Sequence, residues 1–139
     1  MVREVHGRPS RLALRRDGRA YRTYFLDLGG LGVRDLCRVG DVILVLAGPT
    51  MDLDGPVRLY RWHGAARARA ERVIRGARIT RLPGELPIGT GEDEGRDHPE
   101  GITLVPGERG ESVLVVYDSP APARRRGDVI LADVVVLGE

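Results

Sequence analysis

Short apolar runs, separated by turn-forming residues, recur along most of the 139-residue chain. Runs of this length, bounded by Gly, Pro, Asp and Ser, are typical of β-strands. The pattern predicts strands at 11–15, 21–27, 41–47, 57–62, 72–79, 101–105, 112–117 and 128–136. Because the connections between them are short, most neighbouring strands should pair in antiparallel fashion. The sequence therefore predicts an all-β protein built from antiparallel sheets.

The predicted strands differ in the faces that they should bury. The runs VILVLA and VLVVY are apolar at every position, as expected of strands packed on both faces. The run VRLYRW instead alternates, with two aliphatic residues on one face and Arg58, Tyr60 and Trp62 on the other. Such alternation predicts a strand close to the edge or the surface of its sheet.

Three stretches interrupt the pattern of strands. Residues 64–76 are rich in Ala, Arg and Glu, which favours a short helical turn. Residues 83–100 form an acidic segment rich in Gly and Pro, and long loops of this kind are often functional. Residues 118–127 combine prolines with three consecutive arginines, and we interpret them as a charged surface loop rather than a phosphate site.

Composition narrows the class of protein. With 42% hydrophobic and 30% charged residues, the chain is expected to fold as a single domain. Its longest apolar run, 42–47, is too short to span a bilayer, and the first ten residues lack the apolar stretch of a signal peptide. These features predict a cytoplasmic protein that does not enter the membrane.

Charge and cysteine content exclude further classes. The 22 basic residues, all arginine, face 20 acidic ones, so the formal net charge is only +2, and aromatic residues make up 4% of the chain. This balance disfavours nucleic-acid binding, which relies on basic patches and aromatic stacking. The single Cys37 rules out an internal disulfide, and one cysteine with three scattered histidines does not make a structural zinc site.

A weak internal repeat relates the two halves of the chain. Leu36 aligns with Ile102, Pro49 with Pro120, and the segment 55–61 with 127–133, at offsets of 66, 71 and 72 residues. Repeats of a few strands that cannot bury both faces alone are typical of stacked arrays, and units made only of strands indicate a β-propeller.

The repeat predicts the content of each blade. The first blade would contain the strands 32–37, 41–47, 57–62 and 72–79, and the second those at 101–105, 112–117 and 128–136. With the strands before residue 28, this makes about two to three blades, whereas a propeller closes with about four to eight. We therefore expect the chain to be a truncated C-terminal part of a longer propeller, and to self-associate through its uncovered faces.

Four segments carry a resemblance to a known family: GLGVRDL at 30–36, VLAGPTMDLDGPVRLYRW at 45–62, DHPEGITL at 97–104 and VVYDSP at 115–120. In their order and content they resemble the C-terminal part of a bacterial family catalogued as domain of unknown function 3616. The resemblance implies a propeller-like fold. It implies no established activity.

The motif DHPEG supplies the candidate chemistry. The run PEGI is similar to a strand-start motif of esterase-like phytases and lactonase-type propellers, in which acidic residues around the channel hold a metal ion. That similarity implies catalytic roles for Glu100 and His98, and a divalent metal such as calcium held by Asp97 and Glu100. The alternative is structural: these carboxylates accept backbone hydrogen bonds and fix a turn.

Three further residues are candidates for binding a small-molecule substrate: Arg34, Asp35 and Asp118. In the repeat, Arg34 occupies the place of Glu100, so an ion pair between the two is expected. Arg34 could clamp an anionic group with Asp35 orienting it, or the two residues could tie neighbouring blades together.

A second calcium motif fails on spacing. MDLDGP places Asp52 and Asp54 as in an EF-hand, but Arg61 then stands where the bidentate carboxylate belongs, so a β-turn closed by residues 54–56 is favoured.

No serine lies in a G-x-S-x-G nucleophile elbow, and no complete catalytic constellation is present in the sequence. The first hypothesis is therefore a protein of unknown function that acts as a β-propeller-type binding or scaffold module. The alternative is a metal-dependent hydrolase of the esterase-like phytase or lactonase propeller type. A third interpretation, a small β-sandwich or barrel, requires residues 1–28 to close the sheet.

Overall fold

The computed structural model describes residues 18–19, 21–50, 55–70, 72–107 and 110–137. Within these residues every regular element is a strand or a single 3₁₀ turn, which confirms the prediction of an all-β protein. The strands are β1 (Tyr24–Leu26), β2 (Gly32–Val39), β3 (Val42–Gly48), β4 (Arg58–Trp62), β5 (Arg72–Ile74), β6 (Ile79–Arg81), β7 (His98–Gly107), β8 (Gly110–Asp118), β9 (Arg125–Arg126), β10 (Val129–Ile130) and β11 (Asp133–Val136). The 3₁₀ turns are η1 (Ala65–Arg67), η2 (Gly76–Arg78), η3 (Gly91–Asp93) and η4 (Pro122–Arg124).

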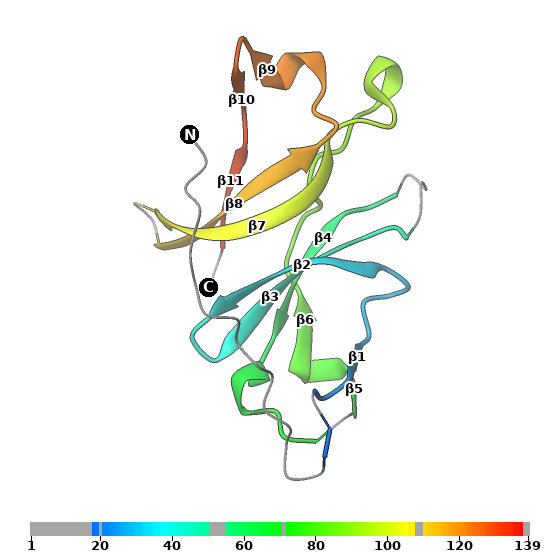
Figure 1. Cartoon of the computed structure of the whole chain (residues 1–139), viewed down its shortest axis with the longest axis vertical. Coiled ribbons are helices and arrows are strands. Elements are labelled where there is room, and N and C mark those ends of the chain that lie inside the picture. The colour runs from blue at the N-terminus through cyan, green and yellow to red at the C-terminus, as the bar shows by residue number, and fades with distance from the viewer. Residues whose placement is uncertain (1–17, 20, 51–54, 71, 108–109, 138–139) are drawn as a thin grey trace.

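Two antiparallel sheets form the body of the molecule (Figure 1). The first has four strands in the order β2-β3-β4-β6, and the second has three in the order β11-β8-β7. Strands β2 and β7, which begin the two sheets, contact each other. A parallel pair, β1-β5, and a short hairpin, β9-β10, are the other sheets of the described chain, and none of the four sheets closes on itself.

The larger hydrophobic core lies between the two main sheets. Leu44 and Leu46 of β3 and Val113 and Val115 of β8 are fully or almost fully buried in this cluster. Removing aliphatic side chains from water is worth about 1.5–3 kcal/mol each, so this contact is the main force that holds the two sheets together.

A second core lies on the opposite face of the four-stranded sheet. Val45 and Ala47 of β3 pack there with Tyr60 and Trp62 of β4 and with Ile74 of β5. Strand β3 is therefore buried on both faces, as its apolar run predicts.

The prediction of a surface strand at 57–62 is wrong. The faces alternate as expected, but β4 lies between β3 and β6, and Tyr60 and Trp62 are buried. The physical reason is an extra layer, formed by β1 and β5, that covers this face of the sheet. There the Tyr60 hydroxyl donates a 2.9 Å hydrogen bond to the Leu28 carbonyl.

The predicted strand at 72–79 is divided in two. Residues 72–74 form β5, which pairs in parallel with β1, while β6 begins only at Ile79 and supplies the fourth strand of the main sheet. The break falls at Gly76, whose φ of +59° opens the η2 turn. The predicted strand at 21–27 is shorter than expected, and the one at 11–15 lies outside the described residues.

The predicted strand at 128–136 is also divided. Its first part, β10, folds back on β9 as a hairpin, with Gly127 at φ +61° in the turn. Only β11 pairs with β8. The loop expected at 118–127 therefore contains the turn η4 and the strand β9 as well as irregular chain.

The other two interruptions are ordered by backbone contacts. The helical turn expected within 64–76 is present as η1, a 3₁₀ turn. In the acidic segment 83–100, the Leu86 amide donates a 2.8 Å hydrogen bond to the Val57 carbonyl, and the buried Leu86 side chain anchors the segment on the core. Among the residues described, no helical segment has the length and apolar content needed to cross a bilayer.

Candidate functional site

Each main sheet begins with a β-bulge at the same place. In β2 the pairing with β3 shifts between Val33 and Asp35, which leaves Arg34 as the extra residue. In β7 the pairing with β8 shifts between Pro99 and Gly101, which leaves Glu100 in the same position. Bulges bend a strand and re-aim a side chain, so both sheets direct their bulge residue by the same device.

The strand pairing also corrects the repeat. Leu36 and Ile102 are equivalent, as the sequence alignment has them, but the first pairs with Val45 and the second with Val115. The alignment at an offset of 71 residues puts Val45 opposite Val116, which is wrong by one residue. Because side chains alternate along a strand, this one-residue error exchanges the two faces of the sheet.

The two bulge residues form the expected ion pair. Arg34 Nη1 donates to Glu100 Oε1, and Arg34 Nη2 donates to the Pro49 carbonyl at 2.8 Å. A Cβ atom on Gly48 would lie 2.6 Å from Arg34 Nε, so the glycine makes room for the guanidinium. The Arg34 side chain is 17% exposed and that of Glu100 is 39% exposed. The pair therefore ties β2 to β7 at the partly open end of their contact.

Asp35 joins the two sheets in a second way. Its Oδ2 atom accepts a 2.7 Å hydrogen bond from the Ile102 amide, and its Oδ1 atom accepts a 2.8 Å bond from the Leu36 amide. A Cβ atom on Gly101 would lie 2.8 Å from the Val116 side chain, so the glycine makes room for its paired residue on β8. Both Asp35 carboxylate oxygens are thus engaged by the backbone.

Asp97 sits in a strained turn just before β7. Its φ is +51°, a left-handed conformation that Asp tolerates better than most residues. Its Oδ1 atom accepts a 2.7 Å hydrogen bond from the Ala121 amide, and its Oδ2 atom lies 2.9 Å from Arg124 Nε. The carboxylate therefore fixes the chain that follows β8.

Arg124 is the centre of a cluster that the sequence analysis did not identify. Its Nη2 atom donates to Asp133 Oδ2 at 2.8 Å, and its guanidinium carbon lies 3.7 Å from the centre of the Tyr117 ring. The Tyr117 hydroxyl donates to the same Asp133 oxygen at 2.5 Å. In the sequence, the run of three arginines that contains Arg124 looks like a solvated loop. Of the residues that Arg124 contacts, only Asp97 was a candidate. The sequence therefore carried little signal for this cluster.

The Arg124 cluster shifts the ionisation of its members. The hydrogen bond from Arg124 lowers the pKa of Asp133, in spite of the opposing effect of burial. Burial, and then the hydrogen bond to Asp133, raise the pKa of Tyr117. The bond to Asp133 likewise raises the pKa of Arg124. At neutral pH Arg124 is thus a cation, Asp133 a carboxylate and Tyr117 a neutral phenol.

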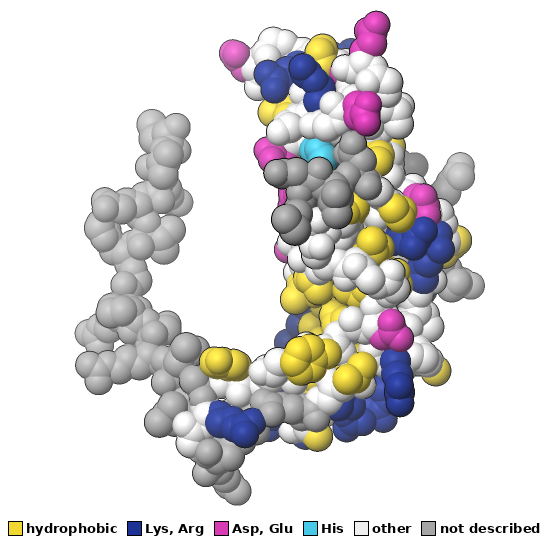
Figure 2. Space-filling model, turned by 90° about the vertical axis from the view of Figure 1, so that its right-hand side faces the viewer, with side chains coloured by type: hydrophobic (Ala, Val, Ile, Leu, Met, Phe, Trp, Pro, Cys, Tyr) yellow, Lys and Arg dark blue, Asp and Glu magenta, His cyan; other side chains and the backbone are white. Residues whose placement is uncertain are grey.

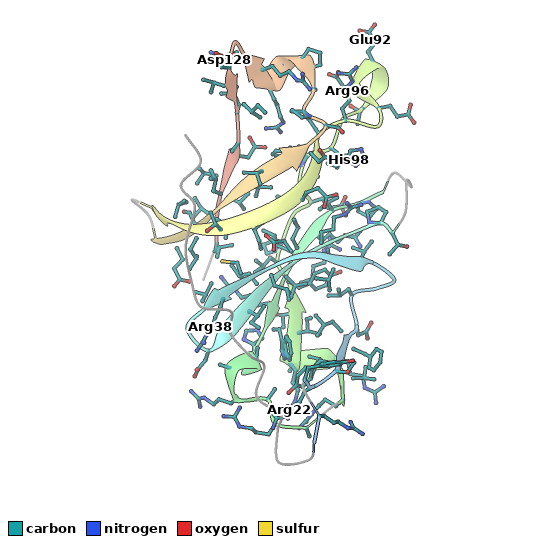
Figure 3. The ribbon with its side chains drawn as sticks, in the orientation of Figure 1. Arg22, Arg38, Glu92, Arg96, His98 and Asp128 are labelled. Carbon is teal, nitrogen blue, oxygen red and sulfur yellow. The ribbon has the colours of Figure 1, made fainter. Side chains whose placement is uncertain are left out.

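The remaining candidates do not join this constellation. His98 and Asp118 pair in register where β7 begins and β8 ends; His98 is half-buried and Asp118 is exposed. Figure 3 shows His98 below the loop that carries Glu92 and Arg96. Within the described residues no hydrogen bond or ion pair joins His98 to Asp97 or Glu100.

The structure does not assemble the expected metal ligands into one group. No set of three or more His, Cys, Asp or Glu side chains in the described part of the chain is arranged to hold a metal ion. Asp97 and Glu100 point to different partners, Arg124 and Arg34. Asp52 and Asp54 of the second calcium motif lie outside the described residues, and so does the first residue of the turn predicted at 54–56.

A pocket of about 430 Å³ lies between β1 and β2, and none of these candidates lines it. Its walls are mainly apolar and aromatic, with Arg22 as the charged member; they are formed by Arg22, Tyr24, Phe25, Leu26, Leu28, Leu31, Val33, Leu36 and Trp62. Sequence reasoning did not find this pocket, because β1 and β2 were expected in different blades.

The fold and the site together define a class: an all-β protein of repeated antiparallel sheets, joined through their bulged first strands by an ion pair. Within that class, the chain belongs to the family described as Protein of unknown function (DUF3616), whose model matches residues 2–133. No curated protein and no solved structure matches the chain.

Proposed function

We propose that the chain is a non-catalytic binding and scaffold module of the β-propeller type. In this proposal the four-stranded and three-stranded sheets are two consecutive blades. Two features support it: β2 and β7, each at one edge of its sheet, contact each other, and both carry a bulge at the same position. Radially repeated antiparallel sheets with adjacent inner strands are the architecture of a propeller.

The observation that carries the non-catalytic assignment is the engagement of the candidate carboxylates. Glu100 pairs with Arg34, Asp97 with Arg124 and the Ala121 amide, and Asp35 with two amides. A calcium ion takes about six to eight oxygen ligands, and a catalytic carboxylate needs an oxygen open to substrate. Contacts of the kind seen here instead fix turns and join sheets. We therefore favour the module over the hydrolase.

We extend the proposal to the setting in which the module works. A chain with one cysteine, Cys37, and no disulfide is suited to a reducing compartment, so we propose a cytoplasmic location.

A double-mutant cycle on the bulge pair tests the structural role. We expect Arg34→Met and Glu100→Gln each to lower the free energy of unfolding, and the double variant to show a coupling of about 0.5–1 kcal/mol. Glu92→Gln, an exposed acidic residue on the loop, is the control and should show no coupling to Arg34→Met. Urea denaturation followed by circular dichroism gives the four free energies.

Calcium titration by calorimetry tests the alternative directly. The module should give no saturable uptake that depends on Glu100. Saturable binding that disappears in Glu100→Gln but persists in Glu92→Gln would contradict the proposal and restore the hydrolase hypothesis. In that case phosphate ester and lactone substrates would be the assays to run.

A further inference from the structure

The corrected repeat gives each main sheet two distinct faces. We call face A of the four-stranded sheet the one that carries Asp35, Cys37, Leu44, Leu46 and Leu59, and face B the opposite one, which carries Val33, Leu36, Val45, Tyr60 and Trp62. By the equivalent pairing, face A of the three-stranded sheet carries Leu114, Val116, Val134 and Val136, and its face B carries Ile102, Val113, Val115 and Tyr117.

The two sheets pack head to tail within the chain. Face A of the four-stranded sheet contributes Leu44 and Leu46 to the main core, and face B of the three-stranded sheet contributes Val113 and Val115. The contact therefore joins unlike faces, A against B. A contact between unlike faces leaves one A and one B face over, so it can be repeated by a further sheet.

Face A of the three-stranded sheet is the first face left over. Val116 is 46% exposed and Val134 is 59% exposed, and Val136 is exposed beside them. The position equivalent to Val116 in the other sheet is Leu46, which is fully buried. A run of exposed valines on one sheet face is a surface suited to a protein contact.

Face B of the four-stranded sheet is open along β2. The layer of β1 and β5 covers its centre, but Leu36 is 50% exposed and Val33 is similarly exposed, and both line the 430 Å³ pocket together with the exposed Phe25. Figure 2 looks onto the side where β1 and the start of β2 lie, and shows hydrophobic side chains gathered around a hollow there. The open part of face B is thus concave and apolar.

The two bulge residues, Arg34 and Glu100, place opposite charges on the two sides of the contact between the sheets. Arg34 belongs to the sheet that offers face A and Glu100 to the sheet that offers face B, and they pair across the contact. In a repeated contact, Glu100 of one copy would come beside Arg34 of the next. The Glu100 side chain is 39% exposed, so it can be reached from the next copy.

From these observations we infer that the partner of this module is a second copy of the same chain. Face A of the three-stranded sheet of one copy docks on the open face B of the next, and continues the contact already made inside the chain. The inference rests on the proposed propeller-type module. The described part of each copy supplies two main sheets, and propellers close with about four to eight blades, so a closed ring of such pairs would contain about two to four copies.

Two complementary variants and their mixture test this arrangement. Val134→Glu places a charge on face A and Leu36→Glu places one on face B; Val129→Glu, equally exposed but on the β9–β10 hairpin, is the matched control. Light-scattering chromatography at micromolar concentration gives the mass of each sample. Circular dichroism and thermal unfolding show that each variant is folded, and Val116→Glu and Phe25→Glu are second variants on the same two faces.

The expected pattern is specific to a head-to-tail contact. The natural chain and Val129→Glu should give one discrete mass of about two to four copies, and Val134→Glu and Leu36→Glu should each be monomeric. Their equimolar mixture should give a dimer with one chain of each kind, because one intact face A then meets one intact face B.

Three results would overturn the inference. A monomeric natural chain would mean that another protein, or nothing, covers these faces. Assembly that survives Leu36→Glu but not Val134→Glu would indicate a symmetric contact between two A faces. A polydisperse mass that ignores both variants would indicate nonspecific association. None of these results alters the calcium titration, so failure here is separable from failure of the non-catalytic assignment.

Discussion

The two main sheets share one framework but differ in what covers them. Both begin with a bulged strand and continue through an antiparallel neighbour with the same pairing. The four-stranded sheet is buried on most of both faces, between the three-stranded sheet and the layer of β1 and β5. The three-stranded sheet is buried on one face, and its other face exposes Val116, Val134 and Val136, although Ser112 on that face is buried. The shared backbone pattern thus does not dictate burial, which depends on the neighbouring layer.

The difference extends to how the sheets are fastened. In the four-stranded sheet Ala47 stands at the position that Tyr117 holds in the other sheet, and it packs in the same apolar core as Ile74 of β5. In the three-stranded sheet the larger Tyr117 joins Arg124 and Asp133 in a polar cluster at the edge. The four-stranded sheet is thus held by apolar layers. The three-stranded sheet is held by one apolar layer and by the Arg124 cluster, which we call the charged clamp: Arg124 with Asp97, Tyr117 and Asp133.

The largest expected effect comes from truncating the two equivalent apolar positions. Leu46→Ala removes a fully buried side chain between the sheets and should lower the free energy of unfolding by about 2–5 kcal/mol. Val116→Ala, at the same place in the other sheet, should cost only about 0.5 kcal/mol, because its side chain is half exposed. Urea denaturation at a protein concentration low enough to give monomers measures both. Equal losses would show that the two faces are covered alike.

A smaller effect should follow from opening the charged clamp. Asp97→Ala removes the acceptor for the Ala121 amide and one of the two carboxylates at Arg124, which is 14% exposed. Leaving these groups without their partner should cost about 1–3 kcal/mol. Asp118→Ala, a nearby but exposed carboxylate, is the control and should stay within about 0.5 kcal/mol. Thermal unfolding of the two variants compares them, and similar melting temperatures would contradict the clamp.

The sequence predicted the first two strands of each main sheet well, because their apolar runs and turns are local signals. It also predicted the pairing of Arg34 with Glu100, since both follow from the repeat. It predicted one strand at 72–79 where the structure has two, β5 and β6. The break at Gly76 frees β5 to pair with β1, a strand from a distant part of the chain. Layers formed by distant segments leave no periodic signal in either segment.

The candidate site shows the same limit. The motif DHPEG was visible as residues that could ligate a metal, but the partners that engage its carboxylates, Arg34 and Arg124, lie 66 residues before Glu100 and 27 after Asp97. The one-residue error in the repeat came from aligning Pro49 with Pro120, whereas the pairing of β2 with β3 and of β7 with β8 makes Val45 equivalent to Val115. Bulges and ion pairs are properties of the packed sheets, and pattern alone does not reveal them.

The smallest expected effect is a pH dependence confined to the clamp. Burial and the hydrogen bond to Asp133 raise the pKa of Tyr117 above its ordinary value of about 10. The unfolded chain therefore releases this proton at lower pH than the folded chain, so stability is full below about pH 10 and falls as the pH rises above it. Tyr117→Phe should cost about 1 kcal/mol at neutral pH, because Asp133 keeps its bond to Arg124. Denaturation curves from pH 7 to about 11 should then bring the natural chain and the variant closer together, since only the natural chain loses this contribution. Parallel curves over that range would mean that burial and Asp133 do not hold the Tyr117 hydroxyl neutral.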